Sequence, residues 1–218
     1  MPYGVSVVNK ILQPGYHRGR APANKGKTYP AEILTPDEIR ALAAQCSTTT
    51  TYGIRHRALI VLLYRTGLRI SEALALQAKD IDFEIGSVAV LHGTGHRRRT
   101  VGIDPGAHEH IEAWIERRRS LGISDPSPLF CTRLGNPILP AHVRAMLHRI
   151  AERAGITKRV HPHGFRHTHA HELAMEGISM PIIQRQLGHV SLETTDIYLS
   201  HIAPKQVIDT MREREWSP

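Results

Sequence analysis

Apolar residues recur at three- and four-residue intervals through most of the chain, which is the spacing of amphipathic helices. Thr35 and Glu38 begin and end a TPDE capping box, which predicts a helix that runs to about residue 46. The largely apolar segment 55–67 predicts a buried helix that ends at its glycine. Residues 70–77 are expected to continue helically after a kink.

The pattern changes at residues 87–92 and 99–103, where short β-type runs flank two glycines and predict a hairpin. Helical spacing then returns. The expected elements of the remaining chain are a helix at 108–120, a short strand at 128–132, an amphipathic helix at 139–155, and three or four short helices within 162–215. The predicted fold class is therefore mainly α with a small antiparallel β-sheet (α+β), in one domain.

Residues 1–31 differ from the rest because they are rich in proline and glycine and carry five cations, Lys25 and Lys27 among them, with no acid. This composition predicts a basic arm or linker, followed by a domain at 32–218. The net charge of the chain is +8. Together with the triple-arginine runs Arg97–Arg99 and Arg117–Arg119, it favours a polyanionic partner such as nucleic acid. The alternative is a basic protein whose cations are only solvated.

Other function classes are disfavoured by simple observations. No apolar run approaches the ~20 residues of a membrane span, and the N-terminus lacks the apolar core of a secretory signal. Cys46 and Cys131 lie far apart and do not form a CxxC pair. They predict no disulfide framework and favour a reducing, intracellular setting.

The stretch HPHGFRHTHAHE at 161–172 contains five histidines, which raises three possibilities: a metal site, a nucleic-acid contact or a catalytic helix. In a helix, His163, Arg166 and His167 share one face. His167 and His171 have the spacing of two metal ligands, but no carboxylate of an HExxH site stands between them and no cysteine is near. Metal binding is therefore disfavoured, and several of these histidines have a structural alternative as caps or solvent-facing residues.

Three separate motifs give the stretch a more specific interpretation. The segment TGLRISEALAL contains Arg69, the segment HGFR contains His163 and Arg166, and the segment LGHVSLETTDIYLSH contains His189 and Tyr198. In their sequence, order and spacing these motifs resemble those of the tyrosine recombinase, or phage integrase, family. The resemblance extends over residues 33–205, and the predicted hairpin lies where the family has one.

The resemblance implies the fold of the tyrosine recombinase catalytic domain and a DNA strand transferase that needs no metal, ATP or other cofactor. Tyr198 would form a 3′-phosphotyrosine link, which conserves the energy of the broken bond. Arg69 and Arg166 would bind the scissile phosphate, because fork-shaped guanidinium groups suit its extra charge. His189 would add a hydrogen bond, and His163 would assist proton transfer at the tyrosine.

The hairpin departs from the family pattern. The family carries a lysine at the tip as general acid, whereas this chain reads GTGHRRR with Thr94 in that position. His96 is the candidate replacement, because an imidazole titrates near neutral pH. Contacts to DNA are expected from the hairpin and from the arm, at Thr94, Arg97, Arg98, Arg99, Lys25 and Lys27.

A second departure is that only the arm at 1–31 precedes the domain, where the family has a helical core-binding domain of ~100 residues. The resemblance implies a double-stranded recombination site as partner and a homo-tetramer on paired DNA, from a monomer or weak oligomer when free, with no membrane. It also implies the cytoplasm of a prokaryote, or a gene of a phage or mobile element. Two alternatives stay open: a catalytically weakened DNA-binding member of the fold, and a DNA-relaxing enzyme similar to type IB topoisomerases.

Overall fold

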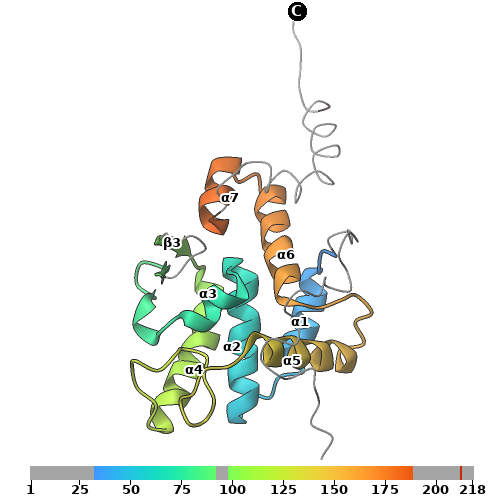
Figure 1. Ribbon diagram of the computed structural model, residues 1–218. Coiled ribbons are helices and arrows are strands. Elements are labelled where there is room, and N and C mark those ends of the chain that lie inside the picture. The colour runs from blue at the N-terminus through green and yellow to red at the C-terminus, as the bar shows by residue number, and fades with distance from the viewer. Residues whose placement is uncertain (1–31, 92–97, 189–211, 213–218) are drawn as a thin grey trace, which may run out of the picture. The chain divides into compact units, whose positions relative to one another are not determined.

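The computed structural model describes residues 32–91, 98–188 and 212. Its elements occur along the chain in the order shown in Figure 1. The helices are α1 (Pro36–Ala44), α2 (Thr51–Thr66), α3 (Ile70–Ala75), α4 (His108–Ser120), α5 (Pro140–Arg153), α6 (Pro162–Met175) and α7 (Met180–Leu187), and the strands are β1 (Ile81–Asp82), β2 (Ser87–Val90) and β3 (Arg99–Gly102). The predicted fold class, mainly α with a small antiparallel sheet, is confirmed.

Helix α2 is the central element of the fold and packs against α1, α3, α4 and α6 (Figure 1). Six consecutive residues, 58–63, are buried because neighbours cover the helix on several sides. The helix begins four residues before its predicted start, because the hydroxyl of Thr50 accepts a hydrogen bond from the Gly53 amide at 3.2 Å. It ends as predicted at Gly67, whose φ of 62° is a left-handed conformation that suits glycine.

The sheet is antiparallel in the order β1-β2-β3, and Val88 of β2 pairs with Val101 of β3. Both valines are fully buried, which joins the predicted hairpin to the core. Strand β1 was not predicted, since two residues carry no periodic signal. The predicted strand at 128–132 is wrong: Cys131 forms an isolated bridge with Pro137, and the peptide oxygen of Leu129 instead accepts from the Trp114 indole at 2.7 Å.

The described residues form two hydrophobic clusters of unequal size. The larger one unites residues from α1 to α6 and the sheet. The smaller one consists of Ala170 and Ala174 of α6 with Ile183 and Leu187 of α7. Helix α7 thus attaches through few apolar contacts, and its placement depends on polar ones. No helix in the described part of the chain is long and apolar enough to cross a membrane.

Candidate active site

Arg69 lies between the end of α2 and the start of α3, where it is the N-terminal cap residue of α3. Its backbone amide donates to Glu72 Oε2 at 2.9 Å, and its guanidinium Nη1 donates to Glu72 Oε1 at 3.1 Å. The Arg69 side chain remains 29% exposed, whereas that of Glu72 is 1% exposed. The buried carboxylate therefore orients a guanidinium group that still reaches the surface.

Glu72 also binds Arg99, the first residue of β3. Arg99 Nη1 and Nη2 each donate to a different carboxylate oxygen of Glu72, both at 2.8 Å. Burial by itself would raise the pKa of Glu72, but the hydrogen bonds and charges of Arg99 and Arg69 outweigh it and lower the pKa. The predicted role of Arg99 is a DNA contact, and the structure places its guanidinium against Glu72. One carboxylate thus joins the base of the hairpin to the Arg69 segment.

We predict that Glu72→Gln lowers the free energy of unfolding at neutral pH by roughly 3 kcal/mol, which is the lower end of the cost of breaking a buried ion pair. The pKa of Glu72 is lower in the folded protein than in the unfolded chain. Its contribution to the free energy of unfolding is therefore fully present above the unfolded-state pKa, and it is lost as pH falls through the folded-state pKa. Urea unfolding at pH 7 and pH 4 measures the difference between variant and wild type. A difference that grows toward acid pH would contradict the prediction.

Arg166 is 1% exposed, and its guanidinium group connects the ends of two helices. Nη1 donates to the Gly67 carbonyl at 2.7 Å, and Nη2 donates to the Leu187 carbonyl at 2.6 Å. Gly67 caps α2 and Leu187 ends α7. Carbonyl groups at helix C-termini lack partners within the helix and carry partial negative charge, so a cation stabilises both ends. Arg166 therefore holds α7 beside the segment that leads to Arg69.

His163 lies three residues before Arg166 on α6, and its ring meets that of His167 edge-on with centroids 4.5 Å apart. Burial lowers the pKa of His163, and the charges of Arg166, His161 and Arg69 lower it further. Arg166 binds the Gly67 carbonyl, two residues before Arg69, so α6 places His163 and Arg166 beside the Arg69 segment. A histidine that is neutral at pH 7 can accept a proton.

The structure thus brings together three of the five motif residues, Arg69, His163 and Arg166. His189 and Tyr198 lie outside the described residues. The same holds for His96, Thr94, Arg97, Lys25 and Lys27. Arg98, by contrast, is described and is exposed. Among residues 32–91 and 98–188, no three side chains of His, Cys, Asp or Glu gather closely enough to hold a metal ion.

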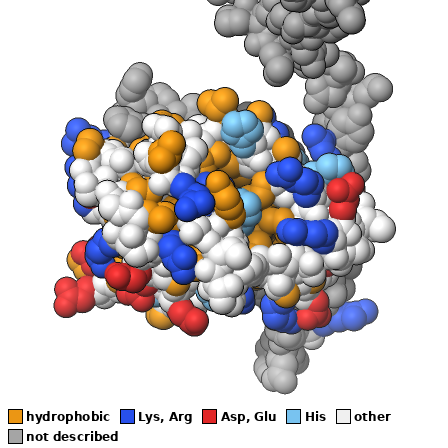
Figure 2. Space-filling model, turned by 90° about the horizontal axis from the view of Figure 1, so that it is seen from below, with side chains coloured by type: hydrophobic (Ala, Val, Ile, Leu, Met, Phe, Trp, Pro, Cys, Tyr) orange, Lys and Arg blue, Asp and Glu red, His pale blue; other side chains and the backbone are white. Residues whose placement is uncertain are grey.

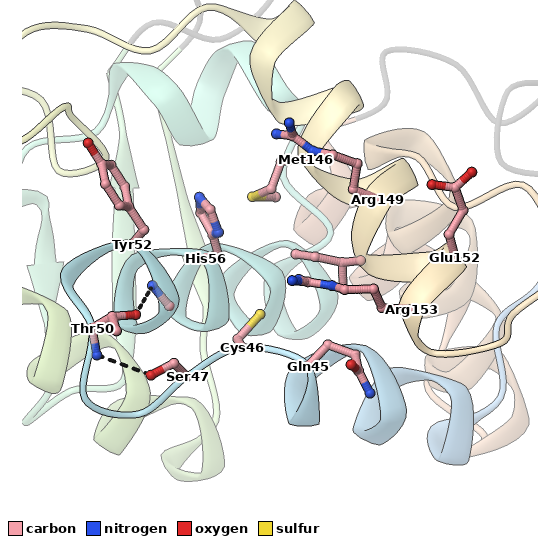
Figure 3. A pocket seen from close by; sticks show the side chains of 12 residues that line it. Gln45, Cys46, Ser47, Thr50, Tyr52, His56, Met146, Arg149, Glu152 and Arg153 are labelled. Carbon is pink, nitrogen blue, oxygen red and sulfur yellow. Dashed lines mark hydrogen bonds between the residues drawn. The ribbon is translucent and has the colours of Figure 1, made fainter.

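A pocket of about 760 Å³ lies between α5 and the start of α2, and no motif residue lines it (Figure 3). Its lining includes Tyr52 and His56 of α2 with Met146, Arg149 and Arg153 of α5. Burial and the neighbouring guanidinium groups lower the pKa of His56 to about 4. The pocket is separate from the candidate active site.

The face seen in Figure 2 carries many Lys and Arg side chains around apolar side chains and histidines.

Comparison with known proteins agrees with this arrangement. The chain is 35% identical over 198 residues to the tyrosine recombinase XerD of Bifidobacterium longum (strain NCC 2705), covering 86% of this chain and 64% of that protein. It is 36% identical to XerC of Anoxybacillus flavithermus (strain DSM 21510 / WK1), covering 76% and 56%. The chain therefore spans less than two thirds of the length of these relatives.

Solved structures show the same fold. The chain resembles the crystal structure of XerA recombinase with a TM-score of 0.74 and 26% identity, over 92% of this chain and 72% of that one. It resembles the integrase of transposon Tn1549, solved in complex with circular intermediate DNA, with a TM-score of 0.70 and 27% identity, over 86% and 66%. The sequence profile of the phage integrase family matches residues 32–204. The chain belongs to the phage integrase family.

Proposed function

We propose that the protein is a site-specific DNA recombinase that breaks and rejoins strands through a 3′-phosphotyrosine link on Tyr198. The observation that carries the proposal is the grouping of Arg69, His163 and Arg166 where α2 ends against α6, in a chain of the phage integrase family. Two guanidinium groups beside a neutral imidazole provide charge for a phosphate and an acceptor for a proton.

In the proposed reaction, the Tyr198 oxygen forms a bond to the scissile phosphorus, and the bond from phosphorus to the 5′ oxygen breaks. Arg69 and Arg166 stabilise the negative charge that develops on the phosphate oxygens, and His189 adds a hydrogen bond. His163 accepts the tyrosine proton, and the leaving 5′ oxygen takes a proton in turn. The covalent link keeps the energy of the broken bond, so the reaction needs neither ATP nor a metal ion.

The proposed partner is a double-stranded recombination site, bound by a homo-tetramer when two sites are paired. One solved relative, XerH, is described in a post-cleavage complex with its palindromic difH substrate; it is 26% identical with a TM-score of 0.70. The basic segment 1–31 is expected to contact DNA phosphates, and the reaction is expected to take place in the cytoplasm of a prokaryotic cell. The net charge of +8 supports a polyanionic partner.

The test is a suicide DNA substrate, in which a nick next to the scissile phosphate lets the cleaved fragment leave. The protein should become covalently attached to DNA, as an adduct that survives SDS, in the presence of EDTA and without ATP. DNA binding without an adduct would show a binding protein of the same fold. Relaxation of plasmids that lack a recombination site would show a topoisomerase instead.

We predict that His96 supplies the proton to the leaving 5′ oxygen. His96→Ala should cleave a normal phosphodiester slowly, by about 10²-fold, the usual contribution of a general acid. A substrate with a 5′-bridging sulfur should restore the rate, because a thiolate leaves without a proton. Single-turnover kinetics on both substrates measure the effect. Thr94→Ala removes an expected DNA contact from the same hairpin, so any loss of rate in that variant should not be restored by the sulfur substrate. Wild-type cleavage of normal DNA by His96→Ala would refute the assignment.

A further inference from the structure

Helix α7 ends at Leu187, the first residue of the third motif, so its last turn sets where the rest of that motif begins. The helix has eight residues, of which Ile183 and Leu187 are buried. Its apolar cluster is small and lies apart from the larger core, whereas Val101 of β3 belongs to that core. Helix α7 lies next to α6 and β3 (Figure 1), and polar contacts therefore contribute much of its orientation.

The side chain of Gln186 makes the densest set of such contacts. Its Oε1 accepts the Gly102 amide at 2.9 Å, and its Nε2 donates to the Gly102 carbonyl at the same distance. Nε2 also donates to the Thr66 carbonyl at 3.3 Å and lies 3.5 Å from His169 Nε2. One amide thus joins α7 to β3, to the last residue of α2 and to α6.

The pair with Gly102 resembles the bonding of a neighbouring strand. Strand β3 is at the edge of the sheet, where backbone groups lack a partner strand. A carboxamide offers an acceptor oxygen and an NH2 group at the spacing of a peptide group, so it can satisfy both groups of one edge residue and keep a second N–H for the Thr66 carbonyl. The next residue, Leu187, gives its carbonyl to Arg166. The absent Cβ of Gly188 would lie 2.6 Å from Arg99 Nε, so the chain passes close to the Glu72 network.

We propose that Gln186 is a positioning residue, which fixes the last turn of α7 against β3 and α2. It thereby fixes, relative to Arg69 and Arg166, the point from which the chain leads on to His189 and Tyr198. The inference rests on the proposed strand-transfer function. Without the amide, α7 keeps its small apolar cluster and the bond from Arg166, but it can shift along the sheet edge. A shift of about 1 Å at a reacting group can cost roughly 10²-fold in rate.

The first experiment compares Gln186→Leu with Gln184→Leu, which is the same change on the same helix at a residue with no contact to β3 among the described hydrogen bonds. Adduct formation on the suicide substrate should slow by about 10- to 100-fold in Gln186→Leu, while the Kd for DNA stays within about twofold of the Gln184→Leu value. The 5′-sulfur substrate should not restore the rate, because the defect concerns attack on phosphorus and not protonation of the leaving oxygen.

The second experiment uses Gln186→Glu and pH. An ionised glutamate can accept the Gly102 amide, but it cannot donate to the carbonyls of Gly102 and Thr66. The protonated acid has one acceptor and one O–H donor, which suffices for the pair with Gly102 but not for the second bond to the Thr66 carbonyl. The rate of Gln186→Glu relative to wild type should therefore rise as pH falls from 8 to 5. In the wild type, burial and the Arg65 charge lower the pKa of the facing imidazole of His169 to about 4, so this imidazole does not titrate in the reference protein across this range.

The outcomes separate this inference from the proposed function. If wild type forms no adduct, the proposed function fails, and the positioning role falls with it. If wild type reacts and Gln186→Leu matches Gln184→Leu, only the positioning role is refuted. Equal losses of DNA binding and reaction in Gln186→Leu, or rescue by the sulfur substrate, would also refute it. A flat ratio of Gln186→Glu to wild type across pH would show that the pair with Gly102 does not act.

Discussion

Replacing Tyr198 with phenylalanine is expected to abolish the covalent protein–DNA adduct. The change removes the oxygen that would attack phosphorus and removes almost no apolar area, so folding and DNA affinity should remain within about twofold of wild type. The residual rate should lie below detection, because no other group in the proposed reaction can form the phosphotyrosine bond. The measurement is the fraction of suicide substrate that migrates with the protein in SDS, together with the Kd for the same DNA.

Tyr64→Phe is the matched control, since it removes the same atom from another tyrosine. The Tyr64 hydroxyl donates to Glu172 Oε1 at 2.7 Å. Burial, together with that hydrogen bond and the nearby carboxylate, raises its pKa to about 12, so it is a poor nucleophile at neutral pH. Tyr64→Phe should keep forming the adduct. An adduct that persists in Tyr198→Phe and disappears in Tyr64→Phe would move the nucleophile to α2.

The helices could be predicted from the sequence because their signals are local. The capping box at Thr35 is confirmed by both of its hydrogen bonds, with Glu38 Oε2 accepting the Thr35 amide at 2.7 Å and Thr35 Oγ1 accepting the Glu38 amide at 3.2 Å. Gly67 ends α2 because its left-handed conformation suits a residue without Cβ. Strand β1, with only two residues, is too short for any periodic pattern to predict.

The contacts of the candidate site could be predicted only in part. The motifs indicate that Arg69, His163 and Arg166 belong together, and the structure brings them together. They do not indicate that Arg166 donates to Gly67, 99 positions away, or that Gln186 pairs with Gly102, 84 positions away. Arg99 was predicted to contact DNA because it lies in an arginine run. Its position next to Glu72 depends on strand register and on burial, which a charge pattern does not contain.

The different environments of Arg69 and Arg166 predict different results for the same substitution. Lysine keeps the positive charge but offers one ammonium group in place of a planar fork. In Arg166→Lys, one ammonium cannot reach the carbonyls of both Gly67 and Leu187 in the present geometry. One buried carbonyl then loses a charged hydrogen bond, at a cost of roughly 1.5 to 3 kcal/mol. We expect Arg166→Lys to lower both Tm and the rate of adduct formation.

Arg69→Lys should lower the rate with little change in Tm. Its side chain is 29% exposed, and Glu72 keeps both bonds from Arg99 when the Arg69 fork is lost. The rate should fall by about 10²- to 10³-fold, the usual effect of removing one donor that stabilises a transition state. Thermal unfolding and single-turnover cleavage of the two variants give the comparison. Equal losses of Tm would show that Arg69 also holds the fold together, and an unchanged Tm in Arg166→Lys would show that α2 and α7 do not depend on its two carbonyl bonds.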